Sequence, residues 1–320
     1  MTHNLRASSS PHIRDGRTTR GIMFDVAIAL LPAALFGAWR FGANAIMVLA
    51  VAVITAVLTE LLIEVIFKKP RTISDGSAVV TGLLLGMSLP PDVPFWIPLI
   101  GSFFAIAVVK MLFGGLGFNF MNPALTARAV LLASWPSIMT TWKFVDTVEA
   151  TASATTVSSA TPIEAVHYGT ASSYGDLFFG NIAGSIGEVS KLLLLIGAAY
   201  LLIRGVIKLY IPLSTLVTVF LFTWAFGGDG GLFTGDGLYA ILSGSVIIGA
   251  FFMATDYTTS PTTPKGQIIM GFGVGLMVFI IRTFGNYPEG VTYAIIFMNI
   301  VVPLIDRYTQ PKLYGGGKRA

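Results

Sequence analysis

The chain has 320 residues, of which 54% are hydrophobic and 11% are charged. An average soluble domain carries about 25% charged residues. So few charges cannot cover this much apolar surface in water, which excludes a water-soluble enzyme, a disordered chain and a nucleic-acid-binding protein. The bilayer is the expected solvent, and the net charge of +4 is typical of basic cytoplasmic loops. The lack of cysteine excludes disulfides and thiolate-bound metals.

Ten apolar segments follow one another along the chain. Several approach the roughly 20 residues that a full membrane crossing needs, whereas the third is short and indicates either a half-helix packed inside protein or a helix extended by its flanks. The sequence therefore predicts an all-α integral membrane protein with ten transmembrane helices. The segments are Ile22–Trp39, Ala43–Phe67, Ser77–Leu89, Phe95–Phe113, Asn122–Ser137, Val189–Ile207, Tyr210–Phe226, Gly237–Ala254, Gln267–Thr283 and Val291–Ile305.

The distribution of Lys and Arg orients these segments. With the N-terminus inside and ten crossings, most of the 20 basic residues fall on the inner side, as the positive-inside rule requires. Both termini are therefore expected in the cytoplasm. The predicted parts are an N-terminal segment (1–21), a first membrane half (22–137), an outer loop (138–188), a second membrane half (189–305) and a tail (306–320).

The outer loop is the one long connection between the predicted spans, and it is rich in Ser and Thr between Thr147 and Thr161. Loops of this length without obvious structure are usually functional or disordered. Composition alone favours a flexible or glycosylated linker. A functional loop remains the alternative.

Short matches between the two halves suggest an internal duplication. Asp75-Gly76 lies at the start of the third segment and Asp236-Gly237 at the start of the eighth, while Phe-Met-Asn occurs at 120–122 and again at 297–299. Five spans in each half would make the repeats inverted, as in many transporters. In such folds the ligand site lies near the midplane, where the repeats meet.

Three polar residues near the fifth segment are candidates for binding a cofactor. Arg128 within this segment needs an anion, a carboxylate or several carbonyls, so it could hold a flavin, a quinone or a phosphate, or form a structural ion pair. Asn119 and Asn122 are three residues apart and would share one face of a helix. Asn122 before Pro123 is equally a good helix N-cap.

Acidic residues near the inner ends of the first two spans are candidates for handling Na⁺ or H⁺. Glu60 and Glu64 lie one helical turn apart, and Asp25 lies early in the first span. Interfacial carboxylates that face water or a lysine are the alternative. A polar turn, Asp256–Pro264, could cradle an anion or cap the following helix.

Several well-known motifs are absent from the sequence. There is no Walker A motif, no dinucleotide-binding glycine fingerprint after a strand and no zinc pattern. We therefore expect no direct NAD binding, no nucleotide hydrolysis and no resident metal.

One element of the outer loop resembles a known cofactor-attachment signature. The run is Ser158, Ser159, Ala160, Thr161, Pro162 and Ile163. It resembles the Ser-Gly-Ala-Thr element, commonly followed by Pro-Leu, of the NqrB/RnfD family of membrane subunits, with Ser159 in place of the usual glycine. A decoy at 153–155 lacks the following proline. The resemblance continues at Ser10–Arg14, Ser74–Gly82 with Leu89–Pro91, Phe118–Arg128, and Met253–Asp256 with Thr259–Thr262. The length favours the RnfD branch.

The resemblance implies a function that composition does not. The family's threonine carries FMN through a phosphoester, so Thr161 would hold covalent FMN, and a non-covalent riboflavin would bind near Asn119, Asn122 and Arg128. Complexes of this kind move electrons between ferredoxin and NAD⁺ and couple them to Na⁺ or H⁺ translocation. Partner subunits of the A, B, C, E and G types would hold the iron–sulfur clusters and the NAD site. The chain alone would not be a complete enzyme.

The same resemblance implies a urea-transporter-like fold of two inverted five-helix repeats in the bacterial cytoplasmic membrane. Two other functions stay open. One is an NqrB-like subunit of a Na⁺-pumping NADH:quinone oxidoreductase. The other is a channel or transporter for a small polar solute on the same scaffold, since fold alone does not define function. The attachment signature distinguishes the redox functions from a solute channel, which has no use for it.

Overall fold

The computed structural model describes residues 18–142, 172–228, 230–285 and 289–311, and this part of the chain is helical without strands. The first half contains α1 (Thr19–Phe41), α2 (Ala43–Ile66), the 3₁₀ turn η1 (Ile73–Asp75), α3 (Ser77–Met87), α4 (Trp96–Phe104), the π-helix η2 (Ala105–Met111), α5 (Pro123–Ser134) and α6 (Pro136–Met139). The second half contains α8 (Tyr174–Phe179), α9 (Lys191–Ile203), α10 (Tyr210–Phe226), α11 (Gly237–Leu242), α12 (Val246–Ile248), the π-helix η3 (Gly249–Met253), α13 (Pro264–Phe284) and α14 (Val291–Thr309).

All ten predicted apolar segments coincide with helical elements, but they differ in kind. Among the described helices, α1, α2, α13 and α14 are long and apolar enough to cross a membrane by length and composition. The third segment forms the 11-residue α3, which rises about 16 Å at 1.5 Å per residue and so covers about half of a 30 Å hydrocarbon core. The eighth segment is broken into α11, α12 and η3. Short and broken helices of this kind are stable at membrane depth only where protein surrounds them.

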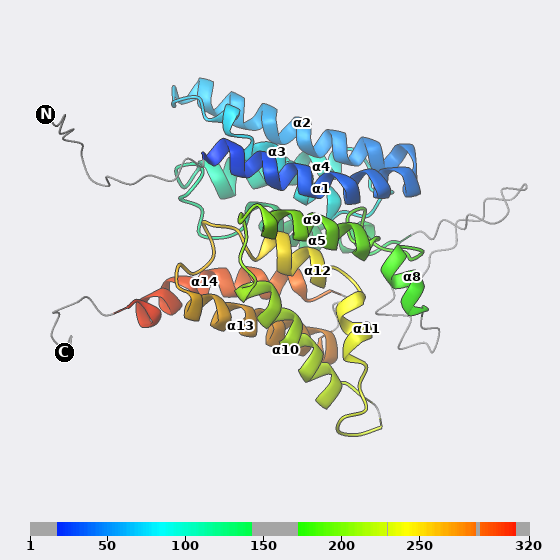
Figure 1. Ribbon diagram of the computed structural model, residues 1–320. Coiled ribbons are helices and arrows are strands. Elements are labelled where there is room, and N and C mark those ends of the chain that lie inside the picture. Colours follow the sequence, from blue (N-terminus) through cyan, green and yellow to red (C-terminus); the bar gives the residue numbers. More distant parts are fainter. Residues whose placement is uncertain (1–17, 143–171, 229, 286–288, 312–320) are drawn as a thin grey trace, which may run out of the picture.

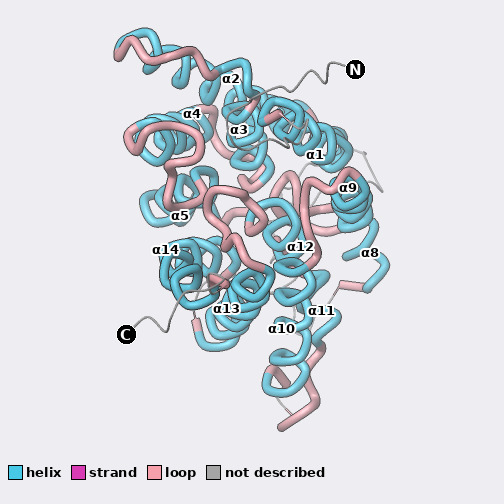
Figure 2. The backbone as a smooth tube through the Cα atoms, turned by 60° about the vertical axis from the view of Figure 1, so that its left-hand side comes forward, coloured by secondary structure: helices cyan, strands magenta, loops and turns pink. Residues whose placement is uncertain are grey.

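The helices form three layers. Helices α1 to α4 lie on one side, α10, α13 and α14 lie on the other, and α5, α9 and α12 lie between them (Figures 1 and 2). The two halves meet through α1 against α9 and α5 against α14. The first contact is close because Gly197 of α9 has no side chain, and a Cβ there would lie 2.1 Å from the carbonyl oxygen of Ala29.

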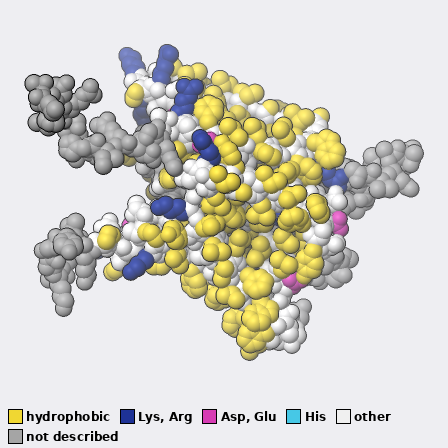
Figure 3. Space-filling model, in the orientation of Figure 1, with side chains coloured by type: hydrophobic (Ala, Val, Ile, Leu, Met, Phe, Trp, Pro, Cys, Tyr) yellow, Lys and Arg dark blue, Asp and Glu magenta, His cyan; other side chains and the backbone are white. Residues whose placement is uncertain are grey.

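The outer surface separates apolar from basic groups. Large hydrophobic side chains are exposed along α2 and α10, among them Ile54, Leu58 and Leu221. They belong to a broad apolar surface, and Lys and Arg gather at the end where α1 begins and α14 ends (Figure 3). So large an apolar surface suits contact with lipid, and the basic end suits one membrane face. We call it the basic end.

Both Asp-Gly matches lie at the start of a short helix, with Gly76 as the N-cap residue of α3 and Asp236 as that of α11, whereas the Phe-Met-Asn matches lie at different places in their helices. Asp75 accepts hydrogen bonds at the start of α3, and Asp236 caps α11. Asn122 stands before the first residue of α5, but Asn299 lies well inside α14. The second match therefore does not align the halves in register.

Candidate functional site

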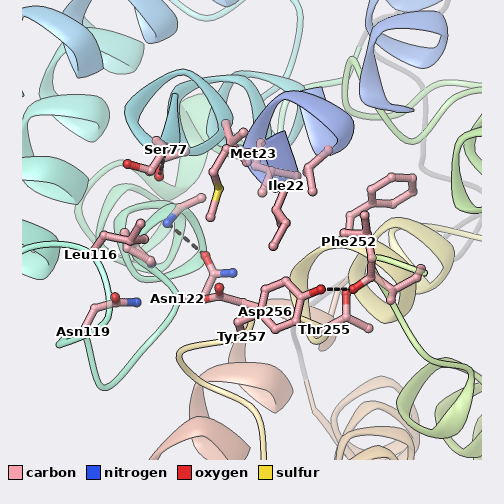
Figure 4. A pocket seen from close by; sticks show the side chains of 18 of the residues that line it. Ile22, Met23, Ser77, Leu116, Asn119, Asn122, Phe252, Thr255, Asp256 and Tyr257 are labelled. Atoms are coloured by element: carbon pink, nitrogen blue, oxygen red, sulfur yellow. Dashed lines mark hydrogen bonds between the residues drawn. The ribbon is translucent and has the colours of Figure 1, made fainter. Parts of the chain in front are cut away.

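A cavity opens where the two halves meet. It has about 750 Å³ of free space when its open mouth is included. Ile22 and Met23 of α1 point into it from one side, and Asn122 and Tyr257 lie on the other (Figure 4). The lining is mostly apolar, and its polar members are Ser77, Lys110, Asn119, Asn122, Thr255, Asp256, Tyr257 and Thr81.

Two π-helices build opposite parts of the cavity wall. The helix η2 supplies Lys110, and η3 supplies Phe251 and Phe252. A π-turn redirects the side chains that follow it and frees a backbone carbonyl, which is one reason why such turns recur at functional sites. Here the carbonyl of Met253, the last residue of η3, accepts a hydrogen bond from Asn122 Nδ2 at 3.1 Å.

Asn122 caps a helix and joins the halves at the same time. Its Oδ1 accepts from the backbone N–H groups of Ala124 and Leu125 at 3.1 and 3.3 Å, and Pro123 follows at the first helical position. The Asn122 backbone N–H donates to Asn299 Oδ1 at 3.2 Å. The capping prediction is confirmed. Both polar atoms of the side chain are hydrogen-bonded within the protein, so Asn122 positions the cavity wall.

Asn119 supplies an unsatisfied acceptor. Its Nδ2 donates to Thr258 Oγ1 at 2.9 Å and to the Met121 carbonyl at 3.2 Å. Its Oδ1 is buried without a hydrogen-bond donor. The expectation that Asn119 and Asn122 share a helix face was wrong, because Asn119 lies in the loop before α5. They nevertheless line the same cavity, because the loop folds back beside η3.

The polar turn after η3 carries a buried carboxylate. Asp256 Oδ2 accepts from Thr258 Oγ1 at 2.8 Å and from Thr259 Oγ1 at 3.2 Å. Burial raises the pKa of Asp256, and these hydrogen bonds lower it in part. Further along, Thr263 Oγ1 accepts from Gly266 N–H and caps α13. The capping alternative is therefore confirmed for the end of this turn. The Asp256 carboxylate lines the cavity, and its negative charge does not suit the binding of an anion.

Arg128 lies apart from the cavity and forms an ion pair. Its Nη2 donates to Glu289 Oε2 at 2.5 Å, and both side chains are buried. Glu289 Oε1 accepts from the backbone N–H of Ser245, at the break between α11 and α12. This is the structural ion pair that the sequence left open. The structure brings Asn119 and Asn122 together and leaves Arg128 elsewhere.

Arg128 belongs to a larger buried cluster that sequence reasoning missed. Lys191 Nζ donates to the carbonyls of Glu188 and Gly244, and Arg282 donates to the carbonyls of Ala240 and Ser243. These groups tie the broken helix to α9 and α13. The signal in the sequence was charge at the ends of apolar segments, where an unpaired charge is costly.

The three candidate ion ligands differ in their surroundings. Asp25 accepts from Tyr200 Oη at 2.8 Å and from Arg204 Nη2 at 3.2 Å, so it links α1 to α9 as an ion pair. Glu60 and Glu64 lie buried on α2. Lys110 Nζ donates to both Glu60 carboxylate oxygens at 2.8 Å, so for Glu60 the alternative of a carboxylate that faces a lysine is confirmed.

The proposed FMN-attachment residues lie outside the described residues. These are Ser158, Ser159, Ala160, Thr161 and Pro162. The flanking helix α8 lies at the end of the molecule opposite the basic end (Figure 1). In the described part of the chain no group of three or more His, Asp or Glu side chains could hold a metal ion.

Comparison with known proteins places the chain in a family. The model of the NQR2, RnfD, RnfE family matches residues 6–315, so the chain belongs to this family. The chain is 48% identical over 317 residues to the D subunit of the Na⁺-translocating ferredoxin:NAD⁺ oxidoreductase complex of Acetobacterium woodii, covering 98% of this chain and 96% of the relative. It is 46% identical over 319 residues to the D subunit of the proton-translocating ferredoxin:NAD⁺ oxidoreductase complex of Clostridium ljungdahlii, covering 96% and 95%. The D subunit of the ion-translocating oxidoreductase complex of Escherichia coli O127:H6 is 36% identical over 353 residues, covering 98% and 99%.

Proposed function

We propose that the chain is the electron-relaying membrane subunit of a ferredoxin:NAD⁺ oxidoreductase complex that translocates Na⁺ or H⁺. FMN would be bound covalently to Thr161 on the outer side, and riboflavin would bind in the cavity. Ferredoxin and NAD⁺ would react at partner subunits of the same complex, and this chain would carry electrons between them within the bacterial cytoplasmic membrane. The similarity to D subunits of ferredoxin:NAD⁺ oxidoreductase complexes supports membership in such a complex. The sequence around Thr161 supports the covalent attachment of FMN.

The cavity suits a flavin ring. A flavin is a flat, largely apolar system with carbonyl acceptors and one imide N–H donor, and the cavity is largely apolar with polar groups at its edge. The unsatisfied Asn119 Oδ1 could accept from that N–H group, and this atom is the single observation that carries the riboflavin assignment. Lys110, which also lines the cavity, would lie near the electron-accepting ring. The bound flavin would supply electron transfer, and the protein supplies position and charge.

The arrangement of helices supports ten crossings with both ends inside. The first residue of α1 and the last of α14 lie at the basic end, which an even number of crossings requires (Figure 1). The Lys and Arg side chains gather at that end (Figure 3). The five-plus-five division, with α3 and the broken α11–α12 at equivalent places, would form two inverted repeats around the cavity. FMN and riboflavin would then lie toward opposite membrane faces, as a relay across the membrane needs.

Two measurements on one preparation test the cofactors. The protein is co-expressed with the flavin transferase and denatured, and covalent flavin is read as in-gel fluorescence. Fluorescence should persist in Thr155→Ala and disappear in Thr161→Ala. If the wild-type band shows no fluorescence although the transferase is active on another substrate, the loop is a linker without flavin. That result would favour the solute-transporter alternative.

Non-covalent flavin is measured in the acid extract of the same native protein. Wild type should release riboflavin, and Asn119→Ala should release much less. Asn44→Ala is the matched control, since Asn44 is exposed and distant in sequence from every cavity residue. Equal riboflavin in wild type and Asn119→Ala would contradict the placement in this cavity.

A further inference from the structure

Lys110 belongs to the cavity and to a buried carboxylate cluster at once. Its side chain is 2% exposed and lines the cavity together with Ser77. Its Nζ donates to Glu60 Oε1 and Oε2, each at 2.8 Å, and to Ser77 Oγ at 2.6 Å. An ammonium group has three hydrogens to donate, so Lys110 is fully engaged in this arrangement. Any change of charge in the cavity acts directly on the cation that neutralises Glu60.

The carboxylate cluster lacks one positive charge. Glu60 and Glu64 are 0% and 2% exposed, and Lys110 is the one described ammonium paired with them. Lys69 Nζ, from the loop after α2, donates to the Met111 carbonyl instead. Asp75 accepts from Ser77 and adds further negative charge beside the cluster. Two buried carboxylates against one ammonium leave a net charge of −1, which a buried site does not readily tolerate.

The unpaired oxygen of Glu64 indicates where a cation would bind in this cluster. Glu64 Oε1 accepts from the backbone N–H of Thr72 at 2.7 Å and from its hydroxyl at 2.5 Å. Glu64 Oε2 is buried without any donor. Thr72 is exposed at the surface, and its hydroxyl also lies 3.0 Å from Glu60 Oε1. Thr72 therefore connects both carboxylates with water at the basic end.

We propose that Glu64 Oε2, with Glu60 and the Thr72 hydroxyl, binds one monovalent cation, H⁺ or Na⁺, and that Lys110 couples this binding to the charge of the flavin in the cavity. The inference rests on the proposed function, because the cavity must hold a redox-active flavin. Glu64 and Glu60 supply negative oxygen ligands, which suit both ions.

The coupling follows from charge balance. One electron passes from a reduced iron–sulfur or flavin donor of a partner subunit to the cavity flavin, so the donor is oxidised and the flavin reduced by one electron. The added negative charge attracts the Lys110 ammonium and weakens its pairing with Glu60. The carboxylates then bind one cation from the basic end, past Thr72. When the electron leaves, Lys110 returns to Glu60 and the cation is released.

The test measures an equilibrium and needs no turnover. The full chain carrying Thr161→Ala is reconstituted in lipid nanodiscs, so that riboflavin is its one remaining flavin. The ratio of reduced to oxidised flavin is measured by absorbance against a reference dye of known potential. Na⁺ is varied at fixed pH, and pH is varied without Na⁺. With one cation bound per reduced flavin, a tenfold rise in the cation concentration should raise this ratio up to tenfold.

Four variants, each made in the Thr161→Ala chain, separate the roles of Glu64 and Lys110. Glu64→Gln should abolish the part of the cation dependence that exceeds the flavin's own proton uptake on reduction. Lys110→Gln should abolish it and lower the reduced fraction at fixed dye potential, and Lys110→Arg should restore both. Lys68→Gln is the control, because Lys68 is an exposed lysine near the end of α2, and it should match the background chain. If Lys110→Gln loses its riboflavin, Glu64→Gln and Lys110→Arg still decide the question.

The outcomes separate this inference from the proposed function. A dependence on Na⁺ that Glu64→Gln abolishes identifies Na⁺ as the cation, and a pH dependence steeper than that of Glu64→Gln identifies H⁺. A chain that binds riboflavin but shows no more dependence on either ion than its Glu64→Gln variant would overturn the inference alone. A chain that binds no riboflavin would overturn the proposed function and the inference with it.

Discussion

The backbone N–H of Asn122 and the side chain of Asn299 are hydrogen-bonded at 3.2 Å, although 177 residues separate them in sequence. Asn299 Nδ2 in turn donates to the Thr259 carbonyl at 2.9 Å. One buried amide therefore holds the start of α5 and the turn after η3 in fixed positions. Both are walls of the cavity, so its shape depends on a side chain outside its lining.

Replacing Asn299 should loosen the cavity without touching its lining. Asn299→Leu removes the acceptor for Asn122 N–H and the donor to Thr259, and each buried group left without a partner costs about 1–3 kcal/mol. We expect a lower melting temperature in detergent and a loss of riboflavin. Intrinsic fluorescence during heating and the acid-extracted riboflavin measure these effects. Asn44→Ala controls for loss of an exposed amide, and an unchanged melting curve of Asn299→Leu would contradict this role.

What could be predicted from the sequence depended on local features. The ten apolar segments follow from composition alone, because a bilayer selects long apolar runs. The Asn122 cap follows from two adjacent residues, since an N-cap and an N1 proline act within one turn. Each such prediction needs no knowledge of the helices that pack nearby.

The partners of the charged residues could not be predicted in the same way. Arg128 meets Glu289, 161 residues away, and Lys110 meets Glu60, 50 residues away. Which charge neutralises which depends on how separate helices pack. The π-helix η2 adds a further difficulty, because it shifts the phase of the residues after it relative to an ordinary helix. Lys110 therefore gave no sign of lining a cavity.

The Arg128–Glu289 pair should behave as a unit in stability measurements. Arg128→Met leaves a buried carboxylate and Glu289→Gln leaves a buried guanidinium, so each should lower the free energy of unfolding by about 3–5 kcal/mol. The double variant removes both charges and keeps an acceptor for Ser245 N–H. It should be more stable than the sum of the single losses predicts. Thermal unfolding of the four proteins in one detergent measures the coupling, and strict additivity would contradict it.

Asp256 should make stability depend on pH. Burial raises its pKa in the folded chain above the value of about 3.9 expected when unfolded. Its contribution to stability is fully present below the unfolded pKa and is lost as pH rises through the folded pKa. The melting temperature of wild type relative to Asp256→Asn should therefore fall as pH rises through that interval. The Asn side chain keeps an acceptor for Thr258 and Thr259, so a difference that stays constant with pH would contradict a titrating Asp256.

The absence of cysteine makes the proposed topology directly measurable, because every introduced thiol is the only one in the chain. Gly175 in α8 is exposed, and an added Cβ meets nothing closer than Ser173 Oγ at 3.8 Å. Lys265 is exposed at the start of α13. With ten crossings and both ends inside, a membrane-impermeant maleimide should label Gly175→Cys on intact cells and Lys265→Cys only after lysis. Labelling of both variants on intact cells would place the two residues on one membrane face and contradict the odd number of crossings predicted between them.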